Sequence, residues 1–225
     1  MLIPAQVAAL LLAVLLALLI GLATPLLLRR LPVPPGDVDV APFIALATPG
    51  FRAVVCGCSA VAGGITFGSL PPSHWPAWVG LVSLGCLLGL IDLRTAFLPL
   101  RLSYLTTACA GVGVVVSAWL RADVWVLAGA VAAGVLATGF FWLVWRLSSG
   151  LGFGDVRLAG LIGLVAGAEG ARFAFLAFLL GTLTGAVWGL VLRWRRRADV
   201  PFAYGPALLL GPLLALGVSR LWLPG

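Results

Sequence analysis

Two of the seven acidic residues in this 225-residue chain stand at the junction between a strongly apolar run and a polar or glycine-rich stretch. Asp92 ends the run WVGLVSLGCLLGLID, and Asp155 opens DVRLAGLIGLVAGA directly after GLGFG. Placing an ionisable side chain in such apolar surroundings costs free energy, so an aspartate at either position is interpreted first as a functional residue. Structural pairing with the adjacent Arg94 or Arg157 is the competing interpretation for either aspartate taken alone.

Two carboxylates that share a partly dry site cannot both ionise cheaply, so such a pair holds one proton between them over a useful pH range. The ionised member can take a proton from water while the protonated member polarises a carbonyl, as in aspartic proteases. This chemistry needs no serine, cysteine or metal. Gly150, Gly152 and Gly154, which precede or flank Asp155, are expected to let the backbone bend and an extended peptide approach closely.

The composition shows what kind of scaffold must position these aspartates. Hydrophobic residues make up 62% of the chain, charged residues make up 9%, and the mean hydropathy is +1.17. Soluble domains are far less apolar, so the chain is predicted to be an all-α, polytopic transmembrane helix bundle. Apolar runs recur along the whole sequence, so residues 1–225 are expected to form a single membrane-embedded domain.

Charges, prolines and glycines divide the chain into eight expected crossings. The helices are predicted near 5–28, 53–70, 77–93, 103–120, 124–145, 157–169, 172–192 and 202–222. The first run contains no basic residue before its apolar stretch, which favours a retained helix over a signal peptide. The segment 157–192 could instead form one long bent helix, which would leave seven crossings.

The basic residues indicate the orientation of this bundle. The chain contains fourteen arginines and no lysine, and with the N-terminus outside eleven of them fall in cytoplasmic loops. The cytoplasmic set is Arg29, Arg30, Arg52, Arg94, Arg101, Arg146, Arg157, Arg193, Arg195, Arg196 and Arg197, and the outer set is Arg121, Arg172 and Arg220. The net charge of +7 is therefore ascribed to topology and contact with the lipid bilayer, and nucleic acid is not an expected partner.

The number of crossings between the two aspartates predicts that they lie on the same side of the membrane. Two complete helices lie between Asp92 and Asp155, so both side chains are expected at similar depth on the cytoplasmic face of the membrane.

The other polar residues have plainer interpretations. His74 lies in an outer loop with two tryptophans, and nothing near it in sequence supplies a catalytic partner. Glu169 has Arg172 close by in an outer turn, where ordinary solvation or pairing suffices. The four cysteines lack paired C-x-x-C spacing, so they are expected to be helix-packing residues, and neither a metal site nor a cofactor is predicted. They are Cys56, Cys58, Cys86 and Cys109.

Three ordered motifs resemble those of the type IV prepilin peptidases, membrane aspartic proteases of the G-x-G-D class. GLIDLRTAFLPLRLSY is similar to the first signature through Asp92 followed by Leu98 and Pro99. GFGDVRLAG is similar to the second through Gly152, Gly154 and Asp155. VPFAYGPALLLG resembles the C-terminal Pro-Phe-Gly-Pro region, with two extra residues that leave it without an assigned site role.

This resemblance implies that Asp92 and Asp155 are the catalytic pair. It also implies the substrate: the short basic leader of a prepilin or pilin-like protein, cut just before a hydrophobic helix at the cytoplasmic face of the bacterial inner membrane. Arg157 stands where the family usually has lysine and keeps the charge, whereas Leu100 replaces a frequent third acid. A homodimer is compatible with these features.

The segment 29–52 is predicted to be an irregular cytoplasmic loop in place of the methyltransferase or zinc domain that many members of the family carry. A short form with peptidase activity and without N-methyltransferase activity is therefore expected.

Two functions of other classes compete with this interpretation. A transporter or ion-coupled channel would use Asp92 and Asp155 as relay carboxylates along a path across the membrane. A noncatalytic component of a pilus or secretion assembly would not need either carboxylate for processing.

Overall fold

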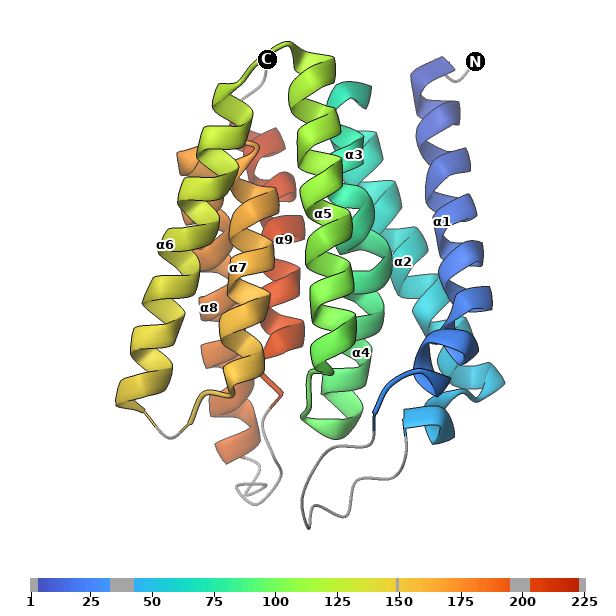
Figure 1. Cartoon of the computed structure of the whole chain (residues 1–225), viewed down its shortest axis with the longest axis vertical. Helices are drawn as coiled ribbons and strands as arrows, with labels where there is room; N and C mark the ends of the chain where they lie inside the picture. The colour runs from blue at the N-terminus through green and yellow to red at the C-terminus, as the bar shows by residue number, and fades with distance from the viewer. Residues whose placement is uncertain (1–3, 33–42, 149, 195–202, 223–225) are drawn as a thin grey trace.

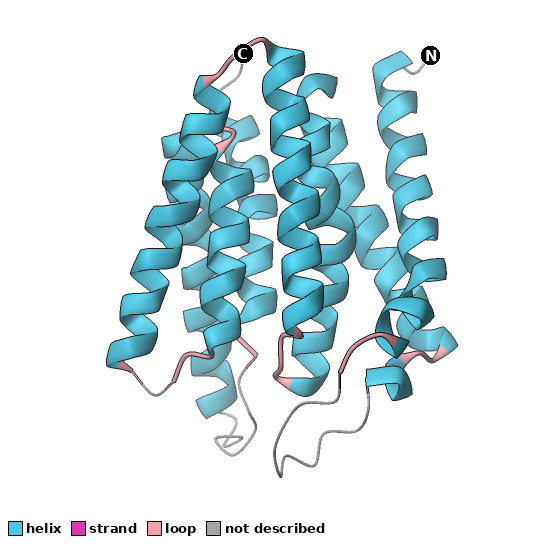
Figure 2. Ribbon diagram, viewed as in Figure 1, coloured by secondary structure: helices cyan, strands magenta, loops and turns pink. Residues whose placement is uncertain are grey.

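The computed structural model of the chain describes residues 4–32, 43–148, 150–194 and 203–222, with side chains up to Ser219. Within these ranges the chain consists of helices and loops and contains no strand (Figures 1 and 2). The predicted all-α helix bundle is therefore confirmed.

The helices follow one another along the chain with short connections. They are α1 (Pro4–Arg29), α2 (Pro49–Ser69), α3 (Trp75–Gly80), α4 (Cys86–Thr95), α5 (Leu100–Arg121), α6 (Trp125–Leu147), α7 (Phe153–Gly167), α8 (Ala171–Trp194) and α9 (Gly205–Trp222). Two short 3-10 helices, η1 (Phe43–Leu46) and η2 (Pro72–His74), and a π-helical segment, η3 (Leu81–Gly85), complete the described elements.

Six stretches of the described chain are long and apolar enough to cross a membrane. Five of them are α1, α2, α5, α6 and α8, and the sixth is the continuous stretch Pro72–Thr95 that joins η2, α3, η3 and α4. The two shorter helices, α7 and α9, run beside these six from one end of the bundle toward the other (Figure 1). Eight helical segments are thus present in the described residues, as the sequence predicts.

The segment 157–192 forms two helices, so the alternative of one bent helix is wrong. Helix α7 ends at Gly167, and α8 begins at Ala171. Between them Gly170 has a φ of +109°, a conformation open to glycine but strained for other residues.

The second helix begins four residues earlier than the sequence predicts. The side chain of Thr48 accepts a hydrogen bond from the Phe51 backbone N–H (3.2 Å), and Pro49 occupies the first helical turn. Both features are typical of a helix start. The predicted 29–52 loop is therefore shorter at both ends, and its middle, 33–42, lies outside the described residues, as do Arg195, Arg196 and Arg197.

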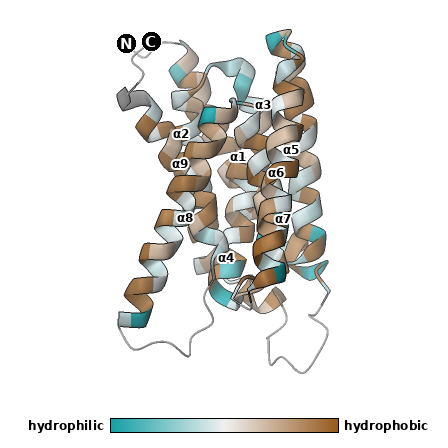
Figure 3. Cartoon of the chain, turned by 90° about the vertical axis from the view of Figure 1, so that its left-hand side faces the viewer, coloured by the Kyte–Doolittle hydropathy of each residue, from teal (hydrophilic) through white to brown (hydrophobic). Residues whose placement is uncertain are grey.

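The connections gather at the two ends of the bundle (Figure 1). The turns that follow α4 and α6 and the start of α9 lie at the end opposite the N-terminus. Polar colours concentrate near the two ends and apolar colours along the helices (Figure 3). This distribution is the one expected when the surface between the ends contacts lipid.

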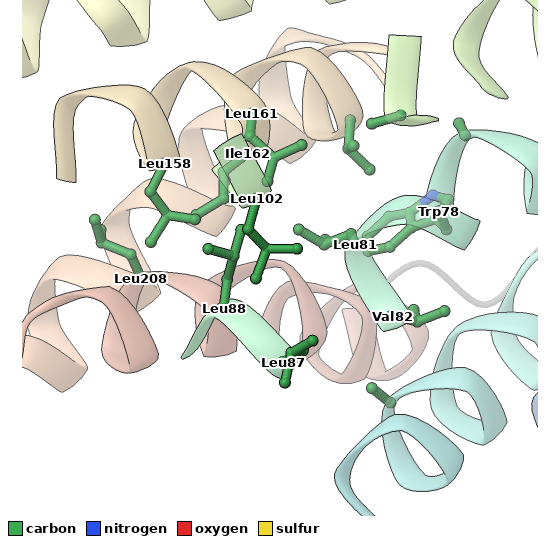
Figure 4. Close-up of a cluster of buried hydrophobic side chains, with 14 of the residues drawn as sticks. Trp78, Leu81, Val82, Leu87, Leu88, Leu102, Leu158, Leu161, Ile162 and Leu208 are labelled. Carbon is green, nitrogen blue, oxygen red and sulfur yellow. The ribbon is translucent and has the colours of Figure 1, made fainter. Parts of the chain in front are cut away.

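Helices pack most extensively as pairs: α1 with α2, α3 with α5, α6 with α7, and α8 with α9. Small residues allow the close approach of the α6 and α7 backbones, because a Cβ added to Gly163 would lie 2.6 Å from the carbonyl oxygen of Ala133. Leucine and isoleucine side chains from α4, α5, α7 and α9 meet in the core, beside Trp78 of α3 (Figure 4). The core therefore ties together the helices that carry the two aspartates.

The π-helical segment η3 interrupts the span that leads to Asp92. A π turn disturbs the regular hydrogen-bond ladder of a helix, and such turns are frequent near functional sites. The buried Ser59 of α2 donates a hydrogen bond to the Val82 carbonyl inside this segment (2.7 Å). This hydrogen bond therefore links α2 to the span at the π-helical segment, where the backbone hydrogen-bond pattern of the span changes.

Candidate active site

Asp92 lies in the last turns of α4, and only 4% of its surface is exposed. Its carboxylate accepts a hydrogen bond from the backbone N–H of Gly205 (3.1 Å), the first residue of α9. The helix ends shortly after, because the Ala96 N–H donates to the Asp92 carbonyl and Ala96 adopts a left-handed conformation with φ of +50°. The start of α9 thus holds an aspartate that comes from the end of α4.

Asp155 lies in the first turn of α7 and is 7% exposed. Its carboxylate accepts the backbone N–H of Gly152 (3.1 Å), and its own N–H donates to the Gly152 carbonyl (3.0 Å). The carboxylate half of a capping box has this geometry, and the N-terminus of a helix favours a negative charge. Asp155 is therefore positioned by the helix that it begins.

The two carboxylates lie at the same end of the bundle and interact electrostatically. Gly205, the first residue of α9, lies close to both α4 and α7. A Cβ added there would lie 2.6 Å from Asp92 Oδ2 and 3.2 Å from Cδ2 of Leu158, which follows Asp155 by one turn of α7. Tyr204, next to Gly205, also interacts electrostatically with Asp155. The end of α4 and the starts of α7 and α9 thus form one site.

The motif residues Leu98 and Pro99 lie in the loop between α4 and α5, and Leu98 packs against the first turn of α7. Leu98 is buried, and its side chain fills the space beside Gly154, where an added Cβ would lie 2.8 Å from the Leu98 Cβ. Pro99 precedes α5 and accepts the Ser103 N–H at 2.9 Å. The Leu-Pro pair therefore packs the loop after α4 against the first turn of α7.

The glycines of the G-x-G-D stretch act differently from one another. The chain bends at Gly150 and Leu151, as the sequence predicts, but Gly154 already belongs to the first turn of α7. None of Gly150, Gly152 and Gly154 has a positive φ. Gly154 is required for space beside Leu98, whereas Gly152 supplies the N–H that holds Asp155.

Arg157 does not pair with Asp155. Its guanidinium lies 5.8 Å from the centre of the Phe153 ring, and its Nε and Nη1 atoms are buried without a hydrogen-bond partner. Neither Asp92 nor Asp155 forms an ion pair with any basic residue that the structure describes, Arg94 included. The interpretation of the aspartates as structural ion pairs therefore lacks support.

Sequence reasoning gave the region around Gly205 no site role, yet its N–H is the hydrogen-bond donor to Asp92. The available signal was the Gly-Pro pair that opens the last apolar run, since proline is favoured in the first turn of a helix. The last helix was predicted to begin at residue 202. With that boundary, the N–H of Gly205 would have been inside the helix and not at its start. The preceding Pro201 and Phe202 lie outside the described residues.

At the opposite end of the bundle, Glu169 has a different partner from the predicted Arg172. Glu169 Oε2 lies 2.6 Å from Nδ1 of His74, and Glu169 Oε1 accepts the indole N–H of Trp78 at 3.0 Å. A guanidinium nitrogen of Arg121 lies 4.0 Å from Oε2. His74, which has no partner nearby in sequence, is thus paired with a residue 95 positions away. These four residues are called the Glu169 cluster below.

Two buried carboxylates with one backbone donor each leave most of their lone pairs free for water or a substrate. One proton shared between them would provide an ionised base and a neutral acid on opposite sides of a bound carbonyl. The described residues contain no group of three or more His, Cys, Asp and Glu side chains that could hold a metal ion. The arrangement suits general acid–base hydrolysis by a carboxylate pair.

Comparisons with known proteins agree with this chemistry. A model of the type IV leader peptidase family matches residues 78–190, half of the chain and the part that contains both aspartates. The chain is 31% identical over 166 residues to the prepilin leader peptidase/N-methyltransferase of Bacillus subtilis (strain 168). That alignment covers 72% of this chain and 62% of the relative, so the chain spans less than two thirds of the relative's length. No solved structure matches the chain. The match over half of its length shows that the chain belongs to the type IV leader peptidase family.

Proposed function

We propose that this protein is a membrane aspartic endopeptidase that removes the basic leader peptide of a prepilin or pilin-like protein. The observation that carries the proposal is the pair of buried carboxylates, Asp92 and Asp155, which interact with each other and lack a basic partner among the described residues. Membership of the leader peptidase family and the name of the Bacillus relative support the same substrate class.

In the proposed mechanism a water molecule binds between the two carboxylates. The ionised aspartate takes a proton from this water, which attacks the carbonyl carbon of the scissile peptide bond. The protonated aspartate donates a hydrogen bond and then its proton to the carbonyl oxygen, which yields a tetrahedral diol. One carboxyl then gives its proton to the leaving nitrogen while the other carboxylate takes a proton from a hydroxyl of the diol, the C–N bond breaks, and the carboxylate pair again shares one proton.

The proposed position of the site is the cytoplasmic face of the bacterial inner membrane. Among residues with described side chains, eight arginines lie in or next to the connections at the aspartate end, and two lie at the other end. The eight are Arg29, Arg30, Arg52, Arg94, Arg101, Arg146, Arg157 and Arg193, and the two are Arg121 and Arg172. Because positive residues accumulate on the cytoplasmic side, this bias favours a cytoplasmic site.

We further propose that the chain lacks methyltransferase activity, because the connection between α1 and α2 is short. The expected result is no transfer of a methyl group from S-adenosylmethionine to a cleaved pilin by the purified protein. Methylation of the new N-terminus, measured by mass spectrometry, would overturn this part of the proposal.

The peptidase proposal is tested by co-expressing the chain with a candidate prepilin that carries a basic leader. We expect leader removal by the wild type and by Glu169→Gln, the matched change at the other end of the bundle. We expect no removal by Asp92→Asn or Asp155→Asn. Cleavage retained in either aspartate variant would overturn the assignment of the pair and would favour a noncatalytic role.

A further inference from the structure

Two grooves open on the sides of the bundle between its two ends, and they are lined by residues of different character. The first, the α2–α9 groove, has a volume of about 360 Å³ and is lined by residues of α2, η3, α4 and α9, among them Cys58, Val61, Gly89, Leu93, Pro206 and Leu213. The second, the α5–α7 groove, has a volume of about 600 Å³ and is lined by residues of α5, α6 and α7.

One end of the α2–α9 groove is lined by sequence neighbours of the residues that form the aspartate site. Pro206 follows Gly205, the residue that donates to Asp92, and Leu93 follows Asp92 itself. Gly89 lies one turn before Asp92 and therefore on the same side of α4. This end of the groove therefore adjoins the residues that carry and hold the Asp92 carboxylate.

The walls of the α2–α9 groove carry no charged residue, and its lining is apolar apart from glycine and cysteine positions. Its floor follows η3 and α4 from Leu81 to Leu93, a length of about 18 Å at 1.5 Å per residue. Val61 and Leu93 are exposed, so the groove is open to the side of the bundle. These dimensions suit about three turns of an apolar helix, and Gly57, beside which an added Cβ would have nothing within 4 Å, permits close approach of a backbone.

The α5–α7 groove does not offer the same access. Arg157, the one charged residue among the described residues that line it, lies two positions after Asp155 on α7, and residues two apart on a helix point to different sides. The buried Nε and Nη1 atoms of this arginine have no hydrogen-bond partner, so an apolar helix placed there would leave them unsatisfied. An apolar segment is therefore better received by the α2–α9 groove.

We propose that the α2–α9 groove binds the apolar helix of the substrate that follows the cleavage site, with its N-terminal end at Asp92. This inference rests on the proposed peptidase function. A lateral groove lets a membrane-embedded substrate arrive from the lipid, and its lower end delivers the first bond before the helix to the carboxylates. The groove thus makes an apolar helix beside the scissile bond a determinant of specificity.

The first test compares Val61→Trp in the α2–α9 groove with Val135→Trp in the α5–α7 groove. Both valines are exposed groove residues, at 62% and 65%, so neither change should disturb the core. With a purified prepilin in detergent, we expect Val61→Trp to raise KM about tenfold or more with kcat unchanged. We expect Val135→Trp to leave both constants within about twofold.

Unchanged kinetics for Val61→Trp in a cleaving enzyme would overturn the groove assignment and leave the peptidase function standing, with lipid as the ordinary occupant. A rise in KM confined to Val135→Trp would move the substrate to the other groove. Failure of the wild type to cleave any prepilin would overturn the proposed function instead.

The second test does not depend on cleavage. A photoreactive benzoylphenylalanine placed at position 61 or at position 135 of an Asp155→Asn chain is irradiated with uncleaved prepilin in membranes. We expect a covalent adduct with the apolar helix of the prepilin from position 61 and none from position 135. Adducts from position 135 alone, or from neither position, would overturn the inference.

Discussion

The two ends of the bundle each bury carboxylates, and the way those carboxylates are satisfied differs. At one end Glu169 contacts the ring of His74, the indole of Trp78 and, at longer range, the guanidinium of Arg121. At the other end Asp92 and Asp155 each accept one backbone N–H and interact electrostatically.

This difference separates a structural carboxylate from a pair suited to catalysis. A buried carboxylate whose lone pairs are occupied by side-chain donors is fixed in place and has little capacity to exchange protons with a ligand. A pair held by single backbone donors keeps its position and leaves oxygens free for water and substrate. Burial alone would not distinguish these cases, because the Glu169 side chain is also largely buried, with 7% of its surface exposed.

The largest expected effect comes from removing one acid of the pair. Asp155→Asn should lower kcat roughly 10³-fold, within the range of 10² to 10⁴ that a positioned acid or base contributes. Glu169→Gln should change kcat less than threefold. The measurement is leader removal by purified protein under single-turnover conditions, and equal losses in the two variants would remove the contrast between the two ends.

A smaller loss is expected when the donor to Asp92 is crowded. In Gly205→Ala the new Cβ would lie 2.6 Å from Asp92 Oδ2, and the carboxylate would have to move. We expect a roughly tenfold to hundredfold lower kcat, because a displacement of about 1 Å at a reacting group costs up to about a hundredfold. The same assay is used.

Gly64→Ala serves as the control for that variant, because an added Cβ at this position of α2 has nothing within 4 Å. We expect unchanged activity and a slightly higher stability, since alanine is the better helix former. Full activity in Gly205→Ala would show that the start of α9 does not position Asp92.

At the Glu169 cluster the expected effect is on stability. His74→Ala leaves the buried Glu169 without its closest partner, a contact of 2.6 Å. The cost is about 2 kcal/mol of unfolding free energy, the scale of an unsatisfied buried polar group. Thermal unfolding in detergent should show a lower Tm while leader removal at a permissive temperature persists. A normal Tm combined with lost cleavage would contradict the structural role.

The smallest effect is expected for Arg157→Lys. The charge on α7 is retained, and the Nε and Nη1 atoms lost with the guanidinium have no hydrogen-bond partner. The kcat should stay within about threefold of the wild type. A loss as large as that of Asp155→Asn would reveal a contact to substrate that depends on the guanidinium shape.

Much of the fold could be predicted from the sequence, because membrane spans are long apolar runs with charged ends. Helix existence was predicted well, whereas the starts of α2 and α7 were placed four residues late. In both cases the helix begins in a stretch with proline or glycine, where capping by Thr48 or by Asp155 decides the boundary. Such caps are short-range contacts that hydropathy does not register.

The candidate site was predictable in part. Asp92 and Asp155 stand out because a carboxylate is unusual in this composition, and Leu98 and Gly154 stand out only through their spacing from these aspartates. Gly205 was missed because its contribution is a backbone N–H, which every residue except proline possesses. A backbone donor becomes special only when the fold brings an acceptor 113 positions away beside it.

The sequence alone determined that the chain is a membrane helix bundle and that Asp92 and Asp155 belong to one face, since both follow from apolar length and the parity of crossings. Tertiary structure decided which carboxylates have side-chain partners: Glu169 contacts His74, whereas Asp92 and Asp155 accept backbone N–H groups and interact electrostatically with each other. The physical reason is that these helices are apolar on every side, so hydropathy cannot show which face of each helix turns inward. That rotation is set by the packing of glycine and leucine side chains between helices far apart in sequence.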